Sequence, residues 1–355
     1  MNRGTNGGAE KGIVSPVAAG IIMLIGASAS AALLQTGGLL GILLMTVASA
    51  ALALLICMRA VVMCCVLCPI SVALGSVIIT VMGGGLESVI LFCSFIAVGG
   101  VLALCVSKAS DRTGTVVAMS FALAMMLIGA LLAEYFAGGG EFSAEGLKTF
   151  IEGKTDALRS VIAEAYKNYM DAVANASAGV KIDAADLNAA AESTATAFIA
   201  ILPGTLIASL QIICYIVTCW FTFFARKMRC EVILPSPRWE LYPTMVTVII
   251  FAVSSVVFAG AYVVALISSS GSVVGTVAYN LNLITMPAFF AIGFSAVFGK
   301  KAAGRRGMAA FIFVVFAIVA LQLAFMTIAI IGAIGVFVRR KAETADKDGG
   351  SGGDE

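Results

Sequence analysis

Residues 200–243 read AILPGTLIASLQIICYIVTCWFTFFARKMRCEVILPSPRWELYP, and this stretch decides the fold. Its first part is apolar over about twenty residues, which is the length that one helix needs to cross the hydrocarbon core of a bilayer. The apolar run ends at Arg226, Lys227 and Arg229, and basic residues beside a span favour the cytoplasmic side. The stretch therefore predicts one crossing that runs from the outside to the cytoplasm.

A proline-rich connector follows this span. Pro235, Pro237 and Pro243 lack the N–H group that a continuing helix needs, so we expect a stiff, non-helical elbow here. Trp239 lies between them, and tryptophan favours the level of the lipid headgroups. Together with Pro203, which lies in the motif LPGTL at the start of the span, these residues form the predicted structural elbow.

The composition of the chain excludes a soluble globular protein. Of its 355 residues, 61% are hydrophobic and only 12% are charged, and the mean hydropathy is +1.05. A soluble domain is about half apolar and about one quarter charged. A multi-pass protein of the cell membrane is therefore predicted, with the lipid bilayer as its first partner.

The sequence also excludes many enzyme classes. It contains no histidine, which rules out Ser-His-Asp and Cys-His catalysis, histidine metal sites and histidine pH switches. The fragment GKT at 153–155 lacks the glycine-rich run of a phosphate-binding loop. We therefore predict no enzyme activity, no cofactor and no nucleic-acid partner.

Apolar runs of about twenty residues predict an all-α, polytopic transmembrane bundle of about eight to ten spans. The predicted parts are a cytoplasmic N-terminus (1–12), an N-terminal membrane bundle of about five spans (13–136), an extracytoplasmic amphipathic helical hairpin (137–195), a C-terminal membrane bundle that contains the elbow at 226–243 (196–338), and a disordered cytoplasmic tail (339–355). With the N-terminus and the C-terminus in the cytoplasm, every Lys and Arg outside residues 137–195 falls on the cytoplasmic side.

The last apolar block, Met308 to Val338, has basic clusters at both of its ends. A single crossing would place Arg339, Arg340 and Lys341 outside, so the charge rule favours a short hairpin or a membrane-dipping segment. One long tilted helix is the alternative, because tilt can absorb an excess of apolar length.

Polar side chains within spans are costly, so they are the candidates for ligand binding. Glu87 and Glu134 lie at the predicted outer ends of two spans, where they either form an acidic entrance or sit in the wet interfacial layer. Gln211, Asn280 and Asn282 carry amides, which both donate and accept hydrogen bonds and suit an uncharged or zwitterionic ligand. The alternative role for these amides is to join neighbouring helices.

A cluster of sulfur-containing side chains occupies the stretch CMRAVVMCCVLCP. Thiolates and thioethers at helical spacing suit soft metal ions. Cysteines in apolar spans also behave as small hydrophobic residues, and this chain has further cysteines in other spans. We favour the packing role and predict no metal site for this cluster, which consists of Cys57, Met58, Met63, Cys64, Cys65 and Cys68.

The order of several motifs resembles a known family. These motifs are GGGLESVILF, the charged loop SKASDRTG, LPGTL, PSPRWELYP, AYNLNLITMPAFFAIGFSAVFGKK and the terminal IGAIGVFVRRK. Their order and spacing are similar to the YybS-like family of bacterial membrane proteins, and the resemblance covers nearly the whole chain. It implies a relation in fold to the S components of energy-coupling-factor transporters, which capture vitamins or other small solutes.

Two functions follow as hypotheses. The first is a small-solute-binding or transport-related subunit that works with a separate ATPase or coupling membrane subunit, with Glu87, Gln211, Asn280 and Asn282 lining its site. The second is a membrane scaffold or regulatory protein that docks partners through its extracytoplasmic hairpin.

Overall fold

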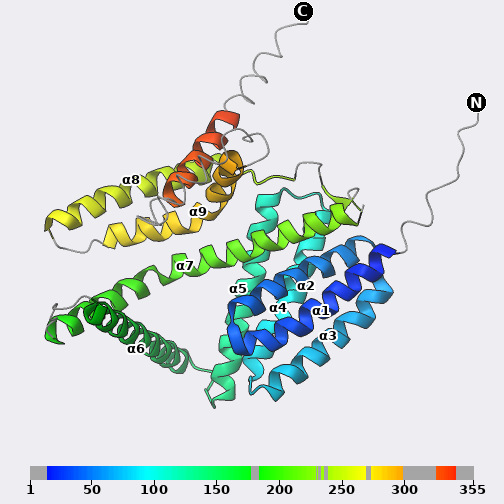
Figure 1. The fold of residues 1–355 in the computed structure, drawn as a ribbon, viewed down its shortest axis with the longest axis horizontal. Coiled ribbons are helices and arrows are strands. Elements are labelled where there is room, and N and C mark those ends of the chain that lie inside the picture. Colours follow the sequence, from blue (N-terminus) through cyan, green and yellow to red (C-terminus); the bar gives the residue numbers. More distant parts are fainter. Residues whose placement is uncertain are drawn as a thin grey trace, which may run out of the picture. The chain divides into compact units, whose positions relative to one another are not determined.

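The computed structural model describes residues 14–176, 184–228, 230, 233–235, 239–268, 273–298 and 325–340. The regular elements are α1 (Val14–Gly37), α2 (Leu39–Cys57), α3 (Val61–Val81), α4 (Leu86–Ser107), α5 (Arg112–Ala137), α6 (Ala144–Ala176), α7 (Ala184–Lys227), α8 (Met245–Ser268), α9 (Val273–Phe298) and a last helix at residues 325–340 (Figure 1). Among the described residues, 8 helices are long and apolar enough to cross a membrane. The predicted class, a polytopic α-helical bundle, is confirmed.

The chain forms two compact units. Unit 1 consists of Met1–Glu134, Ala208–Val248 and Met286–Glu355, and unit 2 consists of Tyr135–Ile207 and Ile249–Thr285. The long helices α7 and α9 each contribute one half to unit 1 and the other half to unit 2.

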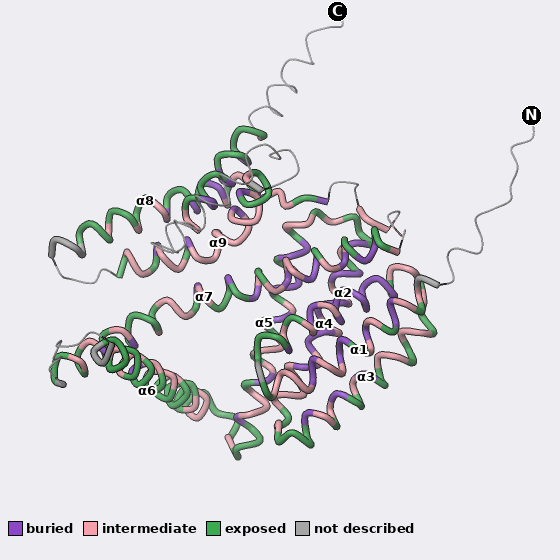
Figure 2. The backbone as a smooth tube through the Cα atoms, viewed as in Figure 1, coloured by how far each residue is buried: buried purple, intermediate pink, exposed green. Residues whose placement is uncertain are grey.

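The core of unit 1 is built on α2. Figure 2 shows buried segments where α1, α2 and α4 pack, and the buried stretch of α2 is rich in alanine. Gly26 lies against Ala48, and Gly99 lies against the backbone of Ser49. Small side chains of this kind let helix backbones approach closely, which is how helices associate where lipid removes the hydrophobic driving force.

The outer faces of the helices are apolar. On α3, for example, large aliphatic side chains are exposed along the helix at Val62, Val66, Ile70 and Val77. Water-soluble monomers rarely expose contiguous apolar surface on this scale. The exposed faces therefore fit contact with lipid.

Unit 2 contains the helical hairpin. Ala163 of α6 packs against Ala191 and Ala195 of α7, with Ile162 and Tyr166 around them. The second arm of the hairpin continues without a break into the span, because α7 runs from Ala184 to Lys227. The turn between the two arms, residues 177–183, lies outside the described residues.

The elbow that follows α7 is non-helical, as predicted, at residues 239–244. Trp239 and Pro243 are buried there, and Pro235 lies in a bend. Pro237 lies outside the described residues. Pro203, at the start of the predicted span, lies inside α7, and the helix continues through it.

The helix at 325–340 packs against the second half of α9. The rings of Phe290 and Phe325 lie 4.8 Å apart, and Gly293 and Gly332 lie against each other's backbones. The end of α9 and the end of the last helix both lie at the elbow, since Ser295 and Arg339 line one cavity with elbow residues.

The last apolar block, Met308 to Val338, is described only at residues 325–338. The hairpin or membrane-dipping segment and the one long tilted helix therefore both stay predictions. Residues 299–324, which include the first part of the block, lie outside the described residues, as do the predicted N-terminal region and residues 341–355 of the predicted tail. Arg339 and Arg340, the first two residues of that predicted tail, belong to the last helix.

Candidate functional site: a charged cluster at the elbow

Arg112 begins α5 and is the centre of the site. The preceding residue, Asp111, caps the helix, because its Oδ2 accepts a hydrogen bond from the Gly114 N–H at 2.9 Å. The Thr115 hydroxyl also donates to the Asp111 carbonyl at 2.8 Å. Aspartate is among the preferred residues at this position. The cap starts the helix at Arg112 and so fixes the base of that side chain in the first turn.

The Arg112 guanidinium joins three segments of unit 1. Its Nε donates to the Thr218 hydroxyl at 2.9 Å, and its Nη2 donates to the Cys219 sulfur at 3.1 Å, both on α7. Its Nη1 donates to the carbonyl of Trp239 in the elbow at 3.3 Å. The guanidinium carbon also lies 4.7 Å from the centre of the Tyr215 ring. The planar guanidinium has five N–H donors, so it can contact several segments at once. A lysine ammonium could not reproduce these contacts.

Trp239 connects the elbow to the loop between α4 and α5. Its indole N–H donates to the Ser110 carbonyl at 3.1 Å, and its ring meets Phe221 edge-on at 6.1 Å. Only 5% of the residue is exposed. Three residues further on, the Tyr242 N–H donates to the Thr113 hydroxyl at 2.8 Å. The elbow is therefore held by specific polar contacts as well as by its prolines.

The last helix adds two arginines to the elbow. Arg339 donates to the Glu240 carboxylate at 3.0 Å, and Arg340 donates to the Pro243 carbonyl at 2.9 Å. The Arg340 guanidinium lies 4.3 Å from the centre of the Tyr242 ring. The Arg339–Glu240 pair is more than half exposed, so it contributes little to stability by itself. Together the contacts place the C-terminal helix on the elbow.

Two cavities adjoin this cluster. The first, which we name the tyrosine cavity, has a volume of about 280 Å³ and is lined by Arg112, Tyr215, Glu240, Leu241, Tyr242, Ala291, Ile292, Ser295, Ala296, Gly335, Val336 and Arg339. Its walls come from α5, α7, the elbow, α9 and the last helix. It therefore combines charges of both signs, two phenol groups and small residues that leave room for a ligand.

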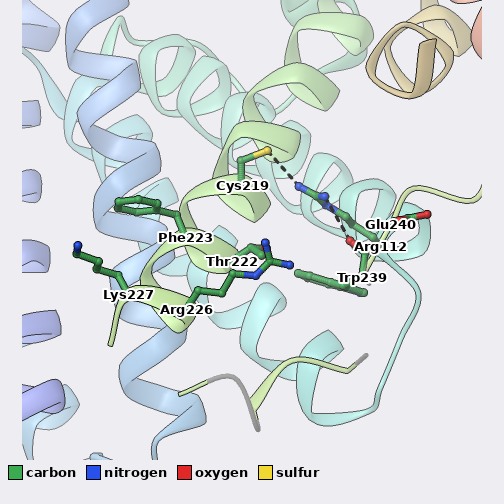
Figure 3. Close-up of a pocket in the computed structure, with 8 residues that line it drawn as sticks. All are labelled: Arg112, Cys219, Thr222, Phe223, Arg226, Lys227, Trp239 and Glu240. Atoms are coloured by element: carbon green, nitrogen blue, oxygen red, sulfur yellow. Dashed lines mark hydrogen bonds between the residues drawn. The ribbon is translucent and has the colours of Figure 1, made fainter. Parts of the chain in front are cut away.

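The second, which we name the basic cavity, has a volume of about 580 Å³. It is lined by Arg112, Cys219, Thr222, Phe223, Arg226, Lys227, Trp239 and Glu240 (Figure 3). Three cations face a single carboxylate in this set. In Figure 3 the Arg226 guanidinium points toward the Trp239 ring, and Lys227 leaves α7 in the opposite direction.

The predicted ligand residues do not line either cavity. Glu87 is half-buried in the first turn of α4, and its carboxylate lies against Gly85 just before the helix. A carboxylate is favourable at a helix N-terminus, so this position fits a local structural role. Glu134 is half-buried near the end of α5, and Gln211 is half-buried on α7.

The side-chain amide of Asn280 on α9 hydrogen-bonds two backbone groups of α7. Its Oδ1 accepts from the Gly204 N–H at 2.7 Å, and its Nδ2 donates to the Ala200 carbonyl at 2.9 Å. In an undisturbed helix these two backbone groups would bond to each other. Pro203, which has no N–H to donate, lies between them and already interrupts the ladder. Asn280 therefore bridges α9 and α7 within unit 2.

Asn282 also joins two helices. Its Nδ2 donates to the Ser255 hydroxyl of α8 at 2.6 Å, and only 1% of the residue is exposed. Of the two predicted roles for these amides, the contacts of Asn280 and Asn282 fit the joining of helices.

Asn280→Ala is expected to lower the free energy of unfolding by about 1–2 kcal/mol, because it removes two interhelical hydrogen bonds that are each worth about 0.6–1.7 kcal/mol in membrane proteins. Thermal unfolding in detergent, followed by circular dichroism, measures the effect. Ser255→Ala is the comparison variant, because it removes one interhelical hydrogen bond, from Asn282, and one bond to the Phe251 carbonyl of its own helix. An Asn280→Ala protein as stable as wild type would show that the inserted amide contributes nothing.

In the cysteine cluster, as elsewhere in the described part of the chain, no three His, Cys, Asp or Glu side chains lie close enough together to hold a metal ion. Cys57 lies on α2, whereas the other three cysteines of the cluster lie on α3. Met58 of the same stretch contacts the elbow, with its sulfur 3.7 Å from that of Cys230. The stretch thus takes part in packing at the elbow.

Sequence reasoning missed the residues that build the two cavities, apart from Trp239. Arg112, Arg226 and Arg339 were interpreted only as markers of membrane orientation, and Glu240 and Tyr242 only as parts of a connector. One signal was present: Arg112 directly follows a helix-capping aspartate, which places a cation inside the first turn of a span. Comparisons with models of protein families, with curated proteins and with solved structures find no match for this chain.

Proposed function

We propose that this polytopic membrane protein binds a small solute in the tyrosine cavity and serves as a transport-related subunit. One observation supports this function above the others: five segments of unit 1 converge on a cavity that holds both signs of charge. Its volume of about 280 Å³ lies near the lower end of the range for ligand pockets. A small metabolite would fill it.

The lining suggests the class of solute. The Arg112 guanidinium has five N–H groups, and its contacts with Thr218, Cys219 and the Trp239 carbonyl use three of them. The other N–H groups suit a carboxylate. Glu240 offers a carboxylate to a cationic group at the opposite side of the ligand, and the two tyrosines offer aromatic faces and hydroxyls. The proposed ligand is therefore a small zwitterion that carries a carboxylate and an amino group.

The proposal includes a separate energising partner, since the sequence encodes no phosphate-binding loop. Membership of the YybS-like family, which the motif order suggests, remains part of the same proposal. The site differs from the one expected from the sequence, because it lies at the elbow and uses arginines and tyrosines.

A solute panel tests the proposal. A ligand at a hundredfold its dissociation constant stabilises the folded state by about 2.7 kcal/mol, so zwitterions that bind should raise the thermal unfolding midpoint of the purified protein. Ala296→Leu, which adds bulk to the lining of the tyrosine cavity, is expected to abolish the shift. Val297→Leu adds bulk at the next residue of α9, outside the lining, and should leave it intact.

Two results would contradict this function. One is a panel of amino acids, vitamins and other small zwitterions that produces no shift in the wild-type protein. The other is a shift of equal size in the Ala296→Leu protein, which would place the ligand elsewhere.

A scaffold role is the second candidate, and the exposed apolar face of α6 favours it. Ile151, Val161 and Tyr169 are exposed on this helix. Deleting residues 146–176 separates the two functions, because a scaffold would lose its partner protein and a solute-binding subunit would keep its ligand affinity.

A further inference from the structure

The basic cavity has a polarity gradient along α7. Cys219, Phe223 and Lys227 follow one another at intervals of four residues, so they lie on one side of the helix. All three are exposed, and all three line the cavity. The wall that α7 gives to the cavity is therefore uncharged at Cys219 and Phe223 and cationic at Lys227, while the Arg112 guanidinium of α5 contacts Cys219.

The cationic end lies where lipid headgroups are expected. Arg226 and Lys227 occupy the last turn of α7, directly before the elbow, and both are exposed. Trp239, an aromatic type that favours the membrane interface, forms part of the same cavity. Arg112 adds a third cation beside it. Cations in a cavity at this level attract anionic headgroups.

We infer that the basic cavity binds an anionic phospholipid of the leaflet on the elbow side. The phosphate would lie at Arg112 and Arg226, where charge-assisted hydrogen bonds to phosphate oxygens are favourable, and Lys227 would add positive charge at the same level of the helix. The adjoining acyl chain would follow the exposed ring of Phe223.

A soluble phosphate ester shares the headgroup chemistry and is the competing source of the ligand. It would use the cations and leave the exposed ring of Phe223, which is 53% exposed, without a role. A phospholipid uses both parts of the cavity. The volume of about 580 Å³ is also about twice that of the tyrosine cavity, which leaves room for a headgroup with part of its chain.

This site is distinct from the proposed solute site. The two cavities share Arg112 and Glu240, but Phe223, Arg226 and Lys227 line only the basic cavity. Variants of these three residues therefore test lipid binding without touching the lining of the tyrosine cavity.

Native mass spectrometry of the full-length protein, released from nanodiscs that contain equal amounts of phosphatidylglycerol and phosphatidylcholine, tests the inference. The wild-type protein should retain phosphatidylglycerol in preference to phosphatidylcholine. Arg226→Gln and Lys227→Gln should each reduce that preference about fivefold, which corresponds to the contribution of one basic residue near an anionic membrane. Lys108→Gln is the matched control, because Lys108 is an exposed cation that lines neither cavity.

A second arm separates lipid from soluble ligand. Glycerol 3-phosphate added in excess should not displace the bound lipid, and Phe223→Ser should weaken retention of phosphatidylglycerol while leaving all cations in place. Equal retention of both lipids by the wild-type protein, an equal loss in the Lys108→Gln control, or displacement by glycerol 3-phosphate would each overturn the inference.

Discussion

Arg112→Gln is expected to release the elbow from α5 and α7 and to lower the free energy of unfolding by about 2–4 kcal/mol, since hydrogen bonds from a charged group contribute about 1.5–3 kcal/mol each and are not additive. Glutamine is shorter and uncharged. It cannot reach Thr218, Cys219 and the Trp239 carbonyl together, as the guanidinium does. The interaction of the guanidinium with the Tyr215 ring is lost as well.

Fluorescence of Trp239 measures this release. The chain has 2 tryptophans, and Trp220→Phe leaves Trp239 as the only one. In that background Arg112→Gln should shift the emission to longer wavelength and make the indole more accessible to a soluble quencher. Trp239 is only 5% exposed in the intact protein, so the change is expected to be large.

Two further variants decide how the effect is interpreted. Arg112→Lys keeps the charge but loses the planar fork, so it should fall between wild type and Arg112→Gln. Lys108→Gln removes an exposed cation from the same loop and should leave Trp239 unchanged. A buried, unshifted Trp239 in the Arg112→Gln protein would mean that the other contacts of the elbow, such as those of Trp239 with Ser110 and of Tyr242 with Thr113, hold it without Arg112.

The position of Arg112 also limits its use as a probe of function. Because Arg112 and Glu240 line both cavities, a substitution at either position would alter the solute site and the lipid site at once. Ala296 and Arg226 each line only one of the two cavities, so variants of these residues report on each site separately.

The spans were predictable because a bilayer demands continuous apolar length. The apolar runs that begin at Leu39 and Leu86 coincide with α2 and α4. The next apolar run begins at Thr115, but α5 already begins at Arg112 because Asp111 caps it. The mean hydropathy of a stretch of sequence carries no information about a single hydrogen bond at a helix terminus.

Partners far apart in the sequence were not predictable from a single chain. Arg112 and Trp239 are separated by 127 residues, and Gly204 and Asn280 by 76. Helical periodicity indicates which face of a helix is apolar, but it does not say which neighbour a polar group will meet. Charges beside the spans therefore predict the orientation of the spans in the membrane, but they give no information about the site.

Gly293→Ala is expected to lower the free energy of unfolding by about 1–3 kcal/mol, the usual cost of forcing extra volume into a packed contact. A methyl group at this position would meet the Ile328 carbonyl oxygen and the Gly332 nitrogen of the last helix. Both are backbone atoms, so no side-chain rotation can relieve the contact. The helix at 325–340 would have to move away from α9, and Arg339 and Arg340 would move with it.

Gly335→Ala is the matched control, because it lies on the last helix with nothing within 4 Å of the added methyl group. In a helix, alanine is favoured over glycine by about 1 kcal/mol, so this variant should be as stable as wild type or more stable. Thermal unfolding in detergent compares the two proteins, and opposite signs are expected. If Gly293→Ala were as stable as Gly335→Ala, the last helix would not cross α9 at Gly293, and the wall that it gives to the tyrosine cavity would be absent.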